Sequence, residues 1–172
     1  APQLHMVWPT LQQFTEDAYA LDFLAEILSS GKKAPLYKVL VKEKDLTSRT
    51  IAYHNAQEIA GEFHIIITAN EGVDLDEVEA GISEAMTLFE TDGVTERDVE
   101  RIKAGLETQF YNGISSVLGK SFQLAQYNVF AGDPGFIEKD IENIKAVTKE
   151  DVMRVYNKYI KDKPFVVTSF VP

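Results

Sequence analysis

The sequence lacks cysteine altogether and contains only three histidines among its 172 residues. Without cysteine the chain cannot form disulfides, thiolate zinc sites or a cysteine nucleophile. None of the histidines, His5, His54 and His64, has a partner four residues away in a predicted helix, so the helical zinc-binding signatures are absent. No apolar run approaches the ~20 residues that a membrane-spanning helix needs, and we therefore expect no membrane span.

Motifs for nucleophilic catalysis and phosphate binding are also missing. The chain has no G-x-S-x-G nucleophile elbow. The run 113–121 is similar to a phosphate-binding P-loop, but it has one residue too many between its glycines and follows a predicted helix instead of a strand. We interpret Gly113 and Gly119 as positions that permit a break in a helix. A small-molecule enzyme with an unrecognised site around Tyr111–Lys120 is the weakest of the functions considered.

The charge of the chain is strongly acidic. Its formal net charge is −10, from 27 acidic and 17 basic residues, which argues against a nucleic acid as partner. Ten of the acids but only one base, Arg97, fall between Asp74 and Glu100. We interpret this segment as two solvated helix faces whose acids gather near the helix N-termini. An acidic wall that attracts basic peptides is the alternative.

Apolar periodicity and capping residues predict the order of helices and strands. Strands are predicted over 4–8, 48–56, 61–69 and 164–171, which are rich in β-branched and aromatic residues. Helices are predicted from the cap Thr15 to a stop at Gly31, over 34–44, from a capping box at Asp74 and Glu77, from a second box at Thr95 with a break at 111–120, and on either side of Thr148.

This order of elements predicts one α+β domain over residues 1–172, with an antiparallel sheet and helices packed on one face. The hydrophobic content of 45% is sufficient for a core. Because four strands leave open sheet edges, we expect a neighbour upstream of Ala1 to supply further strands.

One group of side chains has ligand-type chemistry. His54 and His64 lie on opposite arms of the predicted hairpin, with Glu62 close by, and a cross-strand pair of histidines can bind a metal. Polar cross-strand pairs without metal are far more common, and we interpret these residues in that way.

A group of aromatic side chains surrounds the predicted helix break. They would either line a groove for peptide side chains or fill the core, and we favour the core. These residues are Tyr111, Phe122, Tyr127 and Phe130. The sequence therefore predicts no catalytic, cofactor-binding or metal-ligating residue.

The most informative stretch is 19–46, YALDFLAEILSSGKKAPLYKVLVKEKDL, in which a helix, a Gly-Lys-Lys break and a second helix follow one another. It resembles a block of the non-catalytic half of the pitrilysin, insulinase and mitochondrial-processing-peptidase family of zinc metallopeptidases. The resemblance extends over nearly the whole chain, through the strand at 4–9, the hairpin at 51–69, the helix at 95–106, the segment 132–152 and the final VVTSFVP.

The resemblance implies that this chain contributes no catalytic residues. One domain of that family carries the zinc motif H-x-x-E-H, which this sequence lacks. A later domain in some members supplies an Arg and, seven residues on, a Tyr; the matching positions here hold Val41 and Ser48. In those members the Arg and the Tyr assist in binding the substrate carbonyl. Arg49 and Tyr53 are only four residues apart, so we do not assign this role to them. The chain looks like the related domain, without zinc ligands, that packs beside the zinc domain and helps to enclose a peptide chamber.

The resemblance thus implies a chamber-forming domain of a bacterial-type zinc metalloendopeptidase, excised from a longer multi-domain protein. Alone it would be inactive, because water activation needs the metal and a general-base Glu. Zinc is expected in the parent's catalytic domain and no cofactor in this chain; the implied partners are that zinc domain, in the same or a paired chain, and a peptide substrate. A periplasmic or cell-envelope location is expected only because members of the family are found there. The alternative is a stand-alone, catalytically dead interaction or assembly module of the same fold.

Overall fold

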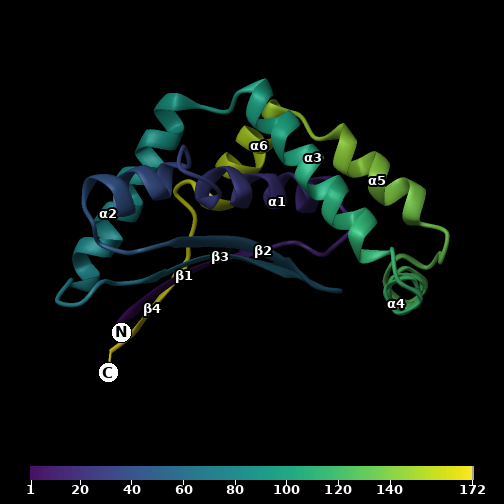
Figure 1. The fold of residues 1–172 in the computed structure, drawn as a ribbon, viewed down its shortest axis with the longest axis horizontal. Coiled ribbons are helices and arrows are strands. Elements are labelled where there is room, and N and C mark those ends of the chain that lie inside the picture. Colours follow the sequence, from purple (N-terminus) through teal and green to yellow (C-terminus); the bar gives the residue numbers. More distant parts are fainter. Residues whose placement is uncertain (172) are drawn as a thin grey trace.

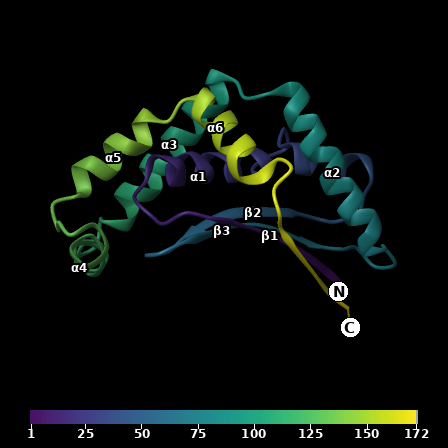
Figure 2. The ribbon, with the colours of Figure 1, turned by 180° about the vertical axis from the view of Figure 1, so that it is seen from behind.

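An antiparallel sheet forms one layer of the molecule, and the helices cover a single face of it (Figures 1 and 2). The computed structural model describes residues 1–171. The strands are β1 (Gln3–Thr10), β2 (Thr50–Ala56), β3 (Gly61–Thr68) and β4 (Val166–Phe170), in the spatial order β2-β3-β1-β4. The predicted fold class is therefore confirmed. Since β1 pairs with β4, the first and the last strand of the chain lie side by side.

The helices follow the predicted order. They are α1 (Glu16–Ser29), α2 (Leu75–Asp92), α3 (Glu96–Gly113), α4 (Val117–Gln126), α5 (Ile137–Ala146) and α6 (Lys149–Val155). Three segments have the wider π-helical hydrogen bonding: η1 (Tyr37–Glu43), η2 (Tyr127–Ala131) and η3 (Tyr156–Ile160). The second helix of the sequence prediction, at 34–44, is thus largely π-helical, although Leu36, Val39 and Leu40 are buried as expected from their spacing.

Side-chain alternation explains which face of the sheet the helices cover. Successive residues of a strand point to opposite faces. In β3, Phe63, Ile65 and Ile67 are completely buried beneath the helices, while the residues between them are partly exposed or exposed. Helix α1 lies across this apolar face (Figure 1) and buries ten of its fourteen residues. It is therefore the centre of the core.

The helix caps are formed by the residues that the sequence indicates. Thr15 caps α1, and Thr95 and Thr148 form complete capping boxes at the starts of α3 and α6. Asp74 caps α2 by accepting the backbone N–H of Asp76. The predicted reciprocal bond from Glu77 is not found among residues 1–171, so that box is only half formed.

Helices α3, α4 and α5 form an arm that extends beyond one end of the sheet (Figures 1 and 2). The predicted break lies between Gly113 and Val117. A side chain at position 119 would collide with the carbonyl of Gly113, so the close approach of the two helix ends requires Gly119. The core interpretation of the aromatic side chains near this break is correct only for Tyr127. Tyr111, Phe122 and Phe130 are 52%, 66% and 41% exposed, because α4 lies at the end of the arm and buries no residue.

The acidic segment follows α2 and the start of α3. Four of its carboxylates form ion pairs with lysines from other elements: Glu84 with Lys44, Glu90 with Lys161, Asp92 with Lys38 and Glu96 with Lys149. The remaining acids lie mostly on exposed faces. This arrangement agrees with the interpretation as solvated helix faces, in which each ion pair contributes little.

Candidate functional site

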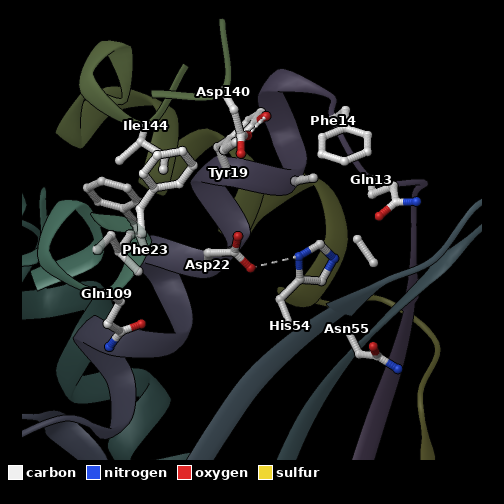
Figure 3. A pocket seen from close by; sticks show the side chains of 14 residues that line it. Gln13, Phe14, Tyr19, Asp22, Phe23, His54, Asn55, Gln109, Asp140 and Ile144 are labelled. Carbon is white, nitrogen blue, oxygen red and sulfur yellow. Dashed lines mark hydrogen bonds and ion pairs between the residues drawn. The ribbon is translucent and has the colours of Figure 1, made fainter. Parts of the chain in front are cut away.

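A cavity of about 390 Å³ opens where the N-terminal half of α1 faces the end of β2 and the arm (Figure 3). Carboxylates from two helices line it: Asp22 of α1 and Asp140 of α5. Its other polar lining comes from His54, from Tyr19 and from neutral amide side chains, and no lysine or arginine of residues 1–171 contributes to it. The cavity therefore has an acidic polar lining.

A chain of hydrogen bonds fixes Asp22. His54 Nδ1 lies 3.2 Å from Asp22 Oδ1, and His54 Nε2 lies 3.0 Å from the hydroxyl of Thr10, at the end of β1. With Nδ1 donating to the carboxylate, a neutral imidazole accepts the Thr10 proton at Nε2. The His54 side chain is completely buried, whereas 46% of the Asp22 side chain is exposed. The buried imidazole thus holds an accessible carboxylate in place.

The order Asp22, His54, Thr10 is that of a catalytic triad, but the Thr10 hydroxyl lies outside the lining of the cavity. Gly61 of β3 packs so closely on this hydroxyl that a methyl group at 61 would lie 2.7 Å from Thr10 Oγ1. A nucleophile needs access to its substrate. The geometry therefore favours orientation of Asp22 over covalent chemistry at Thr10.

Asp140 is held on both of its oxygens. Tyr19 donates to Oδ1, and Tyr127 donates to Oδ2 at 2.6 Å. Asp140 is only 9% exposed. Burial, followed by the neighbouring carboxylate, raises the pKa of both tyrosines, which keeps them protonated as donors. The buried Asp140 side chain, with both oxygens hydrogen-bonded, thus links α5 to α1 and η2.

The surroundings of Asp22 alter its acidity. Desolvation in the cavity raises its pKa, and the hydrogen bond from His54 opposes that rise.

Apolar rings form much of the remaining wall of the cavity, from Phe14, Phe23 and Phe110. Phe14 is itself fixed by ring contacts with Tyr127 and Phe136, at 5.8 and 5.1 Å between centroids.

The histidine pair considered as a metal site does not exist. In the hairpin, His54 pairs with Phe63, and His64 pairs with Tyr53. Because the two registers differ by one residue, the histidines point to opposite faces of the sheet. His54 faces the helices, while His64 stacks on Tyr53 and contacts Glu62 on the uncovered face. Within residues 1–171, no three His, Asp or Glu side chains are grouped closely enough to hold a metal ion.

Sequence reasoning missed both carboxylates of the cavity. A weak signal for Asp22 was available, since it is the one charged residue in the stretch 18–25 of α1. No motif marks Asp140, which belongs to the cavity only through the packing of α5 on α1. Of the residues discussed as possible sites, only His54 lines this cavity.

A second hollow of about 640 Å³ lies between the end of α1 and the start of α3, with the opposite electrostatic character. Asp92 and Asp98 are its only acids, and Asp92 is paired with one of its bases. Its bases are Lys32, Lys33, Lys38, Arg97 and Arg101. The two hollows would therefore select ligands of opposite charge.

Comparison with known families shows which proteins the chain resembles. A family model described as the peptidase M16 inactive domain matches residues 1–106. The zinc protease PqqE of Helicobacter pylori is 22% identical over 154 residues, which are 86% of this chain and 33% of that protein. The chain thus spans about one third of the length of that relative.

Solved structures share the fold over nearly the full length of the chain. A protease from Helicobacter pylori superimposes with a TM-score of 0.85 at 20% identity, covering 99% of this chain and 41% of that chain. An inactive peptidase domain from Bordetella parapertussis gives a TM-score of 0.86 at 16% identity, covering 99% of this chain and 92% of that chain. None of the helices within residues 1–171 is long and apolar enough to cross a membrane.

Proposed function

Since the chain belongs to the peptidase M16 inactive domain family, we propose that it is the non-catalytic domain of a zinc metallopeptidase and packs against the domain that carries the metal. In this role it forms one wall of a chamber that receives peptide substrates. The chain would be part of a longer multi-domain protein or of a paired assembly, and would cleave no peptide by itself.

The chain's own residues do not fit a zinc site. A catalytic zinc requires three protein ligands that converge on one point. The register of the hairpin separates His54 from His64, and the Thr10 hydroxyl and the two tyrosines occupy the hydrogen-bonding positions around His54 and Asp140. We therefore propose that the zinc and the general base belong to the neighbouring domain.

The observation that carries the proposal is the apolar surface of α4. This ten-residue helix buries none of its residues. Val117, Leu118 and Phe122 are 83%, 67% and 66% exposed, and Val129 of the adjoining η2 is 65% exposed. A contiguous exposed patch of large apolar side chains is typical of an interface. Relatives extend well beyond this domain, which supports the zinc-bearing part of the protein as the partner that covers α4.

The experiment uses the complete polypeptide, or complex, that contains this chain. Two charges are introduced on α4 by Leu118→Glu and Phe122→Glu; a matched variant, Ser83→Glu with Thr87→Glu, adds the same charges to exposed positions of α2, at the opposite end of the molecule (Figure 1). We expect only the α4 variant to increase hydrogen exchange of the α4 amides and to lower kcat/KM on a fluorogenic peptide by at least tenfold. Zinc content should stay at one per assembly.

Two outcomes would contradict the proposal. Equal exchange and turnover in both variants would show that the zinc domain does not cover α4. A complete protein without zinc and without turnover would leave the stand-alone interaction module, which the same apolar surface also favours, as the function.

A further inference from the structure

We infer that the cavity around Asp22 binds a positively charged group on an apolar stem, and that its natural occupant is a lysine or arginine side chain of a peptide. The identification of the carrier as a peptide rests on the proposed function. The preference for a cation comes from the cavity itself.

The polar lining has one sign of charge. Asp22 and Asp140 contribute carboxylates, and the amides of Gln13, Asn55 and Gln109 offer carbonyl oxygens without a competing cation. Figure 3 shows Asp22 of α1 turned toward His54 and Asp140 of α5 beside Tyr19, and both belong to the lining of the cavity. A cation in this space would be attracted by both carboxylates, while an anion would be repelled.

Asp22 is positioned to receive a donor. One of its oxygens accepts from His54, and its second oxygen has no hydrogen-bond partner among residues 1–171. The side chain remains 46% exposed to the cavity. Desolvation, which raises the pKa of Asp22, is compensated when an ammonium or guanidinium group donates to the carboxylate. Asp140 differs, because both of its oxygens already have donors.

The apolar walls favour a cation that is carried on an apolar stem. The rings of Phe14, Phe23 and Phe110 contribute to the lining, and such rings attract a cation over their faces and pack against the methylene groups that carry it. A hydrated metal ion would gain nothing from these walls. A volume of about 390 Å³ falls within the range of pockets that enclose a small ligand or one long side chain.

The cavity continues into exposed apolar surface. Phe110 lines the wall, and the ring of the adjacent Tyr111, 5.7 Å away between centroids, is 52% exposed outside it. Residues that flank a basic side chain in a peptide could therefore contact the end of α3 while the charged group enters the cavity.

The test measures binding of short acetylated, amidated peptides to the complete zinc-depleted protein by calorimetry. The peptides are identical except for one central residue, which is lysine, arginine, norleucine or glutamate, and butylamine serves as the free amine. We expect binding of the lysine and arginine peptides only. Asp22→Asn keeps the shape and an acceptor for His54 but removes the charge, and should weaken binding at least tenfold, as loss of a charge-assisted hydrogen bond does. Glu138→Gln removes an exposed acid of α5 outside the cavity and should change nothing.

Three other outcomes of these measurements would contradict the inference. Equal binding of the norleucine peptide, or unchanged binding in Asp22→Asn, would overturn the cation site. Butylamine that binds as tightly as the lysine peptide would overturn the peptide as the occupant. These results do not depend on the exchange of α4 or on turnover, so a failure here is distinguishable from a failure of the proposed function.

Discussion

Arg154 of α6 donates a hydrogen bond to the carboxylate of Asp17 of α1, although 137 positions separate the two residues in the chain. Lys158 and Tyr159 donate to the other oxygen of the same carboxylate, at 2.7 and 2.8 Å. Asp17 is largely buried, with 11% of its side chain exposed. The C-terminal helices are thereby fixed to the central helix through one acidic side chain.

The first prediction concerns the acid stability of this cluster. Desolvation raises the pKa of Asp17, but the donors Arg154, Lys158 and Tyr159 outweigh it and lower that pKa from 3.8 to about 2. A carboxyl group whose pKa is lower in the folded state stabilises the fold above its unfolded pKa, and this contribution is lost as the pH falls through the folded value. Asp17→Asn should therefore lower the free energy of unfolding at pH 7 by about 2 kcal/mol.

Urea unfolding at pH 7, 4 and 2 measures this effect. The difference between the wild type and Asp17→Asn should shrink between pH 4 and pH 2, while Glu58→Gln, an exposed hairpin residue, should follow the wild type throughout. A difference that is the same at all three pH values would show that Asp17 acts through packing instead of charge.

The second prediction concerns the buried anion of the cavity wall. Tyr127→Phe removes one of the two donors to Asp140 without changing the ring. It should destabilise the protein by about 1–3 kcal/mol, since the carboxylate loses a partner that water cannot easily replace. Tyr111→Phe is the matched control, because Tyr111 is 52% exposed, and its free energy of unfolding in urea should stay within about 0.5 kcal/mol of the wild type.

The third prediction contrasts two helical glycines. A methyl group at Gly105 of α3 would meet nothing within 4 Å, so Gly105→Ala should stabilise by roughly 0.5–1 kcal/mol through helix propensity. A methyl group at Gly81 of α2 would lie 2.6 Å from Leu40 Cδ2, and Leu40 is completely buried. Gly81→Ala should therefore destabilise by about 1 kcal/mol, because overpacking exceeds the gain in propensity. Melting temperatures that rise in both variants would contradict the packing of η1 on α2.

The fourth prediction concerns the start of α6. The Thr148 hydroxyl accepts a hydrogen bond from the backbone N–H of Asp151 at 3.2 Å, and the Asp151 carboxylate accepts one from the backbone N–H of Thr148 at 3.0 Å. Thr148→Ala should cost about 1 kcal/mol in chemical unfolding, the usual value of an N-cap. Thr87→Ala, an exposed substitution inside α2, should be neutral or slightly stabilising. A comparable loss in both variants would show that the cap itself contributes nothing.

Short sequence patterns predicted most of the fold. The caps Thr15, Thr95 and Thr148, the strand segments and the break before Val117 follow from short patterns, and all are present. The π-helical hydrogen bonding of η1 was missed, because it depends on how that segment packs and has no distinct apolar period.

Residue placements that depend on a pairing register or on the position of a helix did not follow from the sequence. A shift of one residue decides whether His54 and His64 meet or face opposite sides of the sheet, and composition does not reveal that shift. The aromatic residues of the arm have the spacing of core residues, yet Phe122 is exposed because nothing in the described chain covers α4.

The sequence by itself determined the α+β class, the order of elements and the family resemblance, because these depend on periodicity and on neighbours along the chain. Only the tertiary structure decided that Asp22 and Asp140 share a cavity and that Asp17 binds the C-terminal helices. Contacts between residues 118 to 142 positions apart arise from helix packing, and no local pattern encodes the side on which two distant helices meet.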